Sequence, residues 1–306
     1  MYLYDYKVVD TSFDMQLAAE TSTRSHYKIT FPSPCPVRRE ERNTVYGDLF
    51  MPKSTGRVPL VILTHAFGDA SLAPCLTLAR LLVRQGIAAF VWYLPIDSCR
   101  LPESLKGFSP KTPREWLDIS RSSVIEIRRV VDLLSNREEI DKNKIMVAGM
   151  SFGGVLSSIA MAVDKRISAG VLVVVGGNMA ELSWGGKNVA VASSGHNCSR
   201  EECLAAYSKY PEYLNEVARK GIENVIPAKE CFLFDPLTFA SHLRSRPIVM
   251  INGKDDEAVS EKSTNLLWEA CGKPRLTWVP DGHVATYCKS ELICNEITNL
   301  LSSVRG

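Results

Sequence analysis

Short apolar runs alternate with longer stretches of helical spacing along most of the chain. Val58–His65 and Ile87–Tyr93 are continuous apolar runs, which is typical of strands covered on both faces. Between them, Leu72–Gln85 places apolar residues at helical spacing, and Gly86 follows as a C-terminal cap would. Repeated strand–helix–strand units of this kind predict a mostly parallel, twisted sheet with helices on both faces.

The same alternation extends toward both ends of the chain. The further predicted strands are Tyr27–Phe31, Val45–Phe50, Lys144–Ala148, Ile167–Val175, Arg246–Gly253 and Arg275–Val279. The further predicted helices are Arg114–Leu134, a helix that ends at Val163, Glu261–Ala270 and Val284–Ser302. A loop rich in proline, glycine and serine is predicted over about residues 94–113. The alternation of strands and helices is interrupted over residues 178–236, which show no strand pattern. We interpret this segment as an insertion into a single domain of residues 1–306.

Composition narrows the class of protein. Apolar residues make up 45% of the 306 and charged residues 23%, as in soluble globular proteins. A net charge of +2 without a basic run gives no indication of nucleic acid or an anionic membrane surface as a partner. We see no signal peptide and no apolar stretch long enough to span a membrane. Nine cysteines, an odd count, favour a reduced, cytoplasmic setting. The oligomeric state cannot be inferred.

A serine stands at the end of one predicted strand. The pattern G-x-S-x-G spans Gly149–Gly153, between a predicted strand and a predicted helix. On such a turn a nucleophilic Ser151 would adopt a strained backbone that requires small flanking residues. The amide of Phe152, at the start of the helix, would then be one donor to an oxyanion. The alternative is a plain glycine-rich turn with an exposed serine.

A serine hydroxyl needs a base to act as a nucleophile, and the chain has five histidines. His283 follows the last predicted strand in a Pro-Asp-Gly turn, where it can reach the carboxyl edge of the sheet. Asp255 and Asp256, in the loop after the preceding strand, are both candidates for the third member. The chain order nucleophile, acid, base is the order expected of one fold.

A second oxyanion donor is expected in the loop after Val58–His65. The amide of Phe67 is the candidate, and we interpret His65 as a structural residue that organises this loop. Further along, His196, Cys198 and Cys203 lie close together in sequence. Their spacing is not that of a recognised zinc site, so we expect no metal and no cofactor.

Together these motifs resemble those of the α/β-hydrolase superfamily, over about residue 27 to the end apart from the insertion. The matching segments are His65-Ala66-Phe67, Gly149–Gly153, Gly253–Val259 and Gly282-His283. The resemblance implies the α/β-hydrolase fold, with Ser151 as nucleophile, Asp256 as acid, His283 as base, and Phe152 and Phe67 as oxyanion amides. Ala66 departs from the usual glycine.

The resemblance also suggests a branch and a role for the insertion. Val45–His65 is similar to the serine-esterase, dienelactone-hydrolase-like or acyl-peptidase-like side of the superfamily, although dienelactone hydrolases use a cysteine where this chain has Ser151. Residues 178–236 fall where many members carry a lid or cap. The aromatic side chains of this segment either line an acyl pocket or pack the insertion onto the body: Trp184, Tyr207, Tyr210 and Tyr213.

We therefore expect a serine hydrolase that cleaves a carboxylic ester, or a similar small-molecule acyl compound, through an acyl-enzyme on Ser151. A peptidase acting on small peptides and a thioesterase are alternatives that use the same three residues. A ligand-binding protein that retains the hydrolase fold without catalysis is the alternative from another class.

Overall fold

The computed structural model describes residues 3–7, 12–35, 43–69, 71–96, 100, 109–187 and 198–303. Within these residues one nine-stranded sheet has the order β1-β2-β3-β5-β4-β6-β7-β8-β9. The strands are β1 (Asp14–Glu20), β2 (Arg24–Pro32), β3 (Thr44–Pro52), β4 (Val58–Thr64), β5 (Ala88–Trp92), β6 (Ile140–Met150), β7 (Ile167–Val173), β8 (Ile248–Gly253) and β9 (Arg275–Val279). Pairings from β1 to β5 are antiparallel, and those from β5 through β4 to β9 are parallel.

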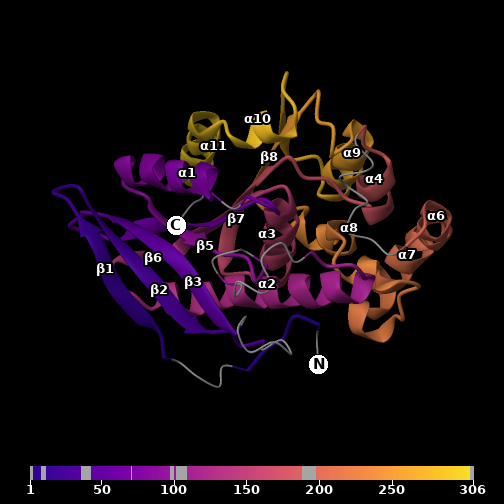
Figure 1. Ribbon diagram of the computed structural model, residues 1–306, viewed down its shortest axis with the longest axis horizontal. Helices are drawn as coiled ribbons and strands as arrows, with labels where there is room; N and C mark the ends of the chain where they lie inside the picture. The colour runs from indigo at the N-terminus through magenta and orange to yellow at the C-terminus, as the bar shows by residue number, and fades with distance from the viewer. Residues whose placement is uncertain are drawn as a thin grey trace.

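Helices cover both faces of the sheet, as Figure 1 shows. They are α1 (Ala73–Arg84), α2 (Pro113–Ser135), α3 (Phe152–Val163), α4 (Met179–Trp184), α6 (Arg200–Tyr207), α7 (Tyr210–Lys220), η3 (Ile222–Asn224), η4 (Glu230–Leu233), α8 (Pro236–Phe239), η5 (Ala240–Leu243), α9 (Glu261–Ala270), α10 (His283–Tyr287) and α11 (Ser290–Ser303). Helices α1 and α11 pack against one face, and α2, α3 and α9 pack against the other. No helix in the described parts of the chain is both long enough and apolar enough to cross a bilayer.

The continuous apolar runs are buried on both faces, as the sequence predicts. Every residue of β5 and β8 is buried, and all of β4 is buried except Pro59. Alternate side chains of these strands enter two separate hydrophobic clusters, one on each face of the sheet. The sheet is thus the centre of the fold, and its loops carry the polar chemistry.

Helix α2 starts where its sequence supplies a cap. The Thr112 hydroxyl accepts from the Glu115 amide at 3.2 Å, and the Glu115 carboxylate accepts from the Thr112 amide at 3.1 Å, with Pro113 in the first turn. This capping box satisfies two amides that the helix leaves without partners. It fixes the start of α2 only a few residues before Trp116, which lines the pocket described below.

Two elements differ from the sequence prediction. Strand β1 was not predicted, and six of its seven residues are exposed. The predicted helix over Val284–Ser302 is instead two helices, α10 and α11, separated at Cys288 and Lys289. The break lets α10 begin at His283 beside the other site residues while α11 packs against α1.

The described part of residues 178–236 contains helices and no strand. Its apolar side chains form a cluster of their own around Phe232, which is fully buried. Tyr207, Tyr210 and Tyr213 surround this ring with centroid distances of 4.9, 4.5 and 5.1 Å. In Figure 1, α6 and α7 lie at the far end of the molecule from β1.

Candidate active site

The turn between β6 and α3 holds Ser151 in an unusual backbone conformation. Its φ of 55° and ψ of −120° lie in a region that residues other than glycine rarely adopt, at a cost of about 1–3 kcal/mol. The Ser151 amide donates to the Val173 carbonyl of β7 at 2.9 Å, and its carbonyl accepts from the Gly154 amide at 2.8 Å. These bonds hold the residue in place and leave its side chain at the pocket.

The two glycines of the motif are required by contacts between backbones. A Cβ atom on Gly149 would lie 2.2 Å from the Gly153 carbonyl oxygen. A Cβ atom on Gly153 would lie 2.3 Å from the carbonyl oxygen of Thr64, at the end of β4. Because neither neighbour is a flexible side chain, only glycine allows the turn, α3 and β4 to approach this closely.

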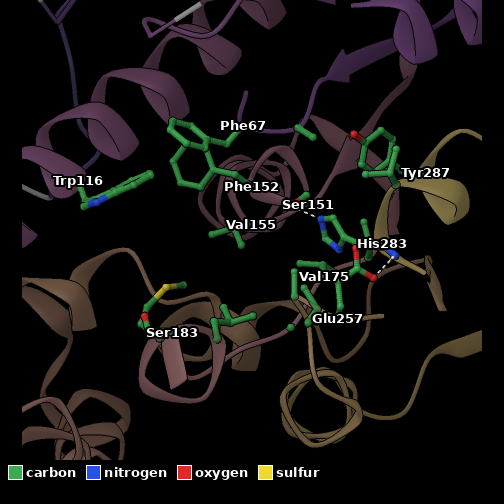
Figure 2. Close-up of a pocket in the computed structure, with 18 of the residues that line it drawn as sticks. Phe67, Trp116, Ser151, Phe152, Val155, Val175, Ser183, Glu257, His283 and Tyr287 are labelled. Atoms are coloured by element: carbon green, nitrogen blue, oxygen red, sulfur yellow. Dashed lines mark hydrogen bonds between the residues drawn. The ribbon is translucent and has the colours of Figure 1, made fainter. Parts of the chain in front are cut away.

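His283 bridges the serine and a carboxylate that come from different loops. Its Nε2 lies 2.9 Å from Ser151 Oγ (Figure 2). Its Nδ1 lies 2.8 Å from Asp256 Oδ2. With the proton on Nδ1, the ring donates to the carboxylate and accepts the serine hydroxyl at Nε2. The arrangement has the hydrogen-bond pattern of a nucleophile, a base and an orienting acid.

The loop after β8 fixes the carboxylate. Asp256 Oδ1 accepts from the amides of Ala258 at 2.9 Å and Val259 at 2.7 Å, and the residue is buried. The neighbouring Glu257 accepts from the backbone amide of His283 at 3.1 Å, which ties this loop to the start of α10. Asp255 is exposed, so the structure brings Asp256 to the histidine and leaves Asp255 at the surface.

His65 organises the loop after β4, as the sequence analysis expects. The residue is buried, its Nδ1 donates to the Ala66 carbonyl at 2.9 Å, and its Nε2 accepts from the Leu94 amide at 3.1 Å. The loop brings Phe67 to the pocket beside Phe152. Phe152 is the first residue of α3, so its amide is one of those without an acceptor inside the helix.

A cavity of about 420 Å³ opens at Ser151 (Figure 2). The aromatic rings of Phe67, Phe152 and Trp116 lie to one side of the serine, and His283, Glu257 and Tyr287 lie to the other. Helix α4 and the chain before α8 supply a further wall that the sequence does not single out: Met179, Leu182, Ser183 and Phe234. This size and largely apolar lining are typical of a small-molecule site.

Most of the insertion's aromatic residues lie away from this cavity. Tyr207, Tyr210 and Tyr213 are buried in the insertion's own cluster, so the interpretation that they line the pocket is wrong and the packing interpretation is correct. Trp184 lines a smaller neighbouring cavity with Cys198 and Cys203. Trp116 is another part of the pocket wall that reasoning from sequence missed. Its helix was predicted, but the periodicity of α2 does not say which turn faces a cavity.

The candidate metal residues are only partly described. His196 lies outside the described residues, while Cys198 and Cys203 are free thiols. Desolvation raises the pKa of Cys203 to about 11, so this thiol is protonated at neutral pH. Within the residues that the structure describes, no group of three or more histidine, cysteine or acidic side chains is arranged to hold a metal ion.

Comparison with other proteins bears on the fold. No family model matches the chain. The uncharacterized protein PA2218 of Pseudomonas aeruginosa is 25% identical over 229 residues, which are 71% of this chain and 54% of that protein. The chain thus spans about half the length of the curated relative that it matches.

Solved structures align over nearly the whole chain. Acetyl xylan esterase from Paenibacillus sp. R4 gives a TM-score of 0.62 at 16% identity, covering 94% of this chain and 88% of that one. A cold-adapted esterase from an Arctic intertidal metagenomic library gives 0.61 at 17% identity, covering 94% and 97%. The alpha/beta hydrolase GrgF from Penicillium sp. sh18 gives 0.59 at 16% identity, covering 91% and 98%. With its mixed sheet, the order of its strands and these structural relatives, the chain has the α/β-hydrolase fold.

Proposed function

We propose that this protein is a serine hydrolase that cleaves a carboxylic ester through an acyl-enzyme on Ser151. The single observation that carries the proposal is the pair of hydrogen bonds from His283, at 2.9 Å to Ser151 Oγ and at 2.8 Å to Asp256 Oδ2. These distances lie within the range required for direct proton transfer from the serine. The esterases among the structural relatives are consistent with this chemistry.

In the first half of the reaction, Ser151 Oγ forms a bond to the acyl carbon while His283 Nε2 takes the hydroxyl proton. The carboxylate of Asp256 stabilises the imidazolium that forms. The charge on the carbonyl oxygen is met by the backbone amides of Phe152 and Phe67, each worth about 3 kcal/mol of barrier. The carbon–oxygen bond to the alcohol then breaks, and the alcohol leaves with the proton from His283.

In the second half, a water molecule replaces the alcohol. His283 removes its proton as the oxygen attacks the acyl carbon, and the bond to Ser151 Oγ breaks. The serine recovers its proton from the histidine, and the carboxylic acid is released. No metal or organic cofactor takes part in these steps. A thioester would follow the same sequence with a thiol as the leaving group, and an amide with an amine.

We propose that residues 178–236 form the lid of this site within a single domain. Met179, Leu182 and Ser183 of α4 and Phe234 contribute one wall of the cavity, so the segment limits the size of the substrate. A lid of this kind also excludes water from the reacting groups. The neighbouring strand-end loops supply the catalytic side chains, and the insertion determines the shape of the cavity.

Ester hydrolysis by the wild type and by Ser151→Ala tests the proposal. We expect turnover of short-chain and aromatic esters by the wild type and a fall in kcat of about 10⁴-fold or more in the variant. Circular dichroism and thermal melting of the variant provide the control for folding. Equal rates in the two proteins would refute Ser151 as the nucleophile. No turnover of any ester, thioester or amide would instead favour the ligand-binding alternative.

A further inference from the structure

The cavity at Ser151 has, besides the wall from α4 and Phe234, two sides that differ chemically. On one side, Phe67, Trp116 and Phe152 come from the loop after β4, from α2 and from the start of α3. On the other side lie His283, Tyr287 and Glu257, as Figure 2 shows. An ester also has two sides, an acyl group and an alcohol, so the two halves of the cavity can be assigned to the two halves of a substrate.

The three rings form one aromatic cluster that is open toward the cavity. The centroid of Trp116 lies 5.3 Å from that of Phe67 and 5.2 Å from that of Phe152, and the Phe67 and Phe152 centroids are 6.4 Å apart. Two of the three pairs are edge-to-face, the arrangement that aromatic rings prefer. Phe67 keeps 41% of its surface exposed. An aromatic guest would therefore cover ring surface that faces solvent in this structure.

The side of the cavity opposite the aromatic cluster carries a negative charge, that of Glu257. Among the described residues that line the cavity, Glu257 is the only carboxylate, and no lysine or arginine is present. Among the described residues Glu257 has no ion pair, and its carboxylate accepts from the backbone amide of His283 at 3.1 Å. A second negative charge placed there would be repelled without a cation to offset it.

The geometry of the reaction decides which half of the ester lies on which side. His283 Nε2 must reach the oxygen of the leaving alcohol, because it supplies the proton for that oxygen. The alcohol therefore lies on the side of His283, Tyr287 and Glu257. The acyl group is attached to the same carbon and can extend away from the histidine, where the aromatic cluster lies.

We infer that Phe67, Trp116 and Phe152 form the acyl-binding subsite, and that the substrate is an ester of a carboxylic acid that carries an aromatic ring, with an alcohol part that carries no negative charge. This inference rests on the proposed function, because it takes Ser151 as the nucleophile and His283 as the base. Trp116 is the residue of the subsite to which the proposed mechanism gives no catalytic role. It has no part in the proton transfer or in binding the oxyanion.

Two isomeric esters test the assignment of the two sides. Methyl phenylacetate and benzyl acetate contain the same atoms, with the phenyl ring on the acyl side in the first and on the alcohol side in the second. We expect kcat/KM, divided by the rate constant for hydroxide hydrolysis of each ester, to favour methyl phenylacetate by about tenfold or more. A preference for benzyl acetate, or equal values, would overturn the assignment.

The variant Trp116→Ala tests whether the aromatic cluster causes the preference. We expect it to lower the ratio of kcat/KM for methyl phenylacetate over methyl acetate about tenfold, and Trp116→Phe to restore most of that ratio. Trp268→Ala is the matched control, because Trp268 lies on α9, donates to the Pro274 carbonyl and does not line the cavity. General destabilisation of either variant would lower both rates by the same factor and leave their ratio unchanged. An unchanged ratio in Trp116→Ala would refute the subsite.

The charge on the alcohol side is tested with two phenylacetyl esters. One is the ester of glycolate, which carries a carboxylate, and the other is the ester of ethylene glycol, which is neutral. We expect the wild type to hydrolyse the neutral ester about tenfold faster at low ionic strength, and Glu257→Gln to narrow this difference to about threefold or less. Glutamine keeps an oxygen that accepts from the His283 amide. An unchanged difference in the variant would refute the role of Glu257.

Failure of this inference can be distinguished from failure of the proposed function. If the protein hydrolyses methyl acetate in a reaction that requires Ser151, while the phenyl ring gives no advantage on the acyl side, the function holds and the subsite is wrong. If neither ester is hydrolysed and Ser151→Ala changes nothing, the proposed function itself fails, and the inference fails with it.

Discussion

The strand-end loops that carry Ser151, Asp256 and His283 border the same cavity as the insertion of residues 178–236, yet the two regions are built in different ways. In the loops, backbone contacts leave little freedom, as at Gly153, where a Cβ would lie 2.3 Å from a carbonyl oxygen. The side chains are then oriented by hydrogen bonds of 2.7–3.0 Å. The main chain therefore fixes the positions of the site side chains in these loops.

The insertion instead depends on side-chain packing around one buried carboxylate. Asp235 is fully buried and accepts from the amides of Asn178 at 3.1 Å, Met179 at 2.8 Å and Leu237 at 3.0 Å, and from the Tyr207 hydroxyl at 3.0 Å. These bonds join the start of α4 to α6 and α8. Aromatic rings around Phe232 fill the space beside them. Main-chain contacts therefore position the side chains at Ser151, whereas side-chain packing in the insertion determines the shape of the cavity wall.

The largest expected effect lies in the loops. Asp256→Asn should lower kcat for an ester about 10⁴-fold, because an amide donates where the imidazole needs an acceptor and favours the wrong tautomer. The amide oxygen still accepts from Ala258 and Val259, so the melting temperature should change little. The matched control is Asp255→Asn at the exposed neighbour, which should retain activity within about twofold. A loss of less than tenfold in Asp256→Asn would remove Asp256 from the mechanism.

An intermediate effect is expected in the insertion. Phe232→Ala removes a fully buried ring and should lower the free energy of unfolding by about 3–5 kcal/mol. Hydrogen exchange should accelerate in α6 and α7 and stay slow in β6 and β8, because the insertion has its own cluster. Faster exchange throughout the sheet would show instead that the two regions unfold as one unit.

The smallest effect concerns the pH dependence of stability. Burial raises the pKa of the Asp235 carboxyl above its ordinary value of 3.8, so the folded protein binds this proton more tightly than the unfolded chain. The contribution of Asp235 to stability is therefore fully present below pH 3.8 and is lost as the pH rises through the raised pKa. Tyr207 and Tyr210, whose pKa values are raised well above 10.0, do not titrate in this range.

Denaturant titrations of the wild type and Asp235→Asn measure this linkage. The free energy of unfolding of the wild type minus that of Asp235→Asn should fall as the pH rises from about 3.8, and should then become constant. An increase of this difference over the same range would mean that the folded protein favours the ionised carboxylate, and would contradict the assignment.

The same contrast explains how much of the structure the sequence could predict. Helix α9 and strand β9 were predicted with the observed bounds, and β4 and β5 within one residue at each end, because periodicity and turn residues are local signals. The convergence of Ser151, Asp256 and His283 was also predictable. Each follows a strand of a parallel sheet, and such strands end at the same edge. The expected fold is confirmed.

What could not be predicted depends on contacts between distant segments. Strand β1 has exposed side chains and is defined only by its pairing with β2. The tyrosines of the insertion are equally aromatic whether they line a pocket or fill a core, and only their position relative to Phe232 distinguishes the two. Trp116 enters the cavity because of how α2 crosses the sheet, and no local pattern encodes that angle.

Covalent labelling tests the central claim most directly. A fluorophosphonate probe reacts with a serine only where a base and an oxyanion site activate its hydroxyl, and mass spectrometry of the digested protein locates the label. We expect one label per chain, on Ser151, and its loss in His283→Ala. A folded wild-type protein that remains unlabelled, or that carries the label on another residue, would contradict it.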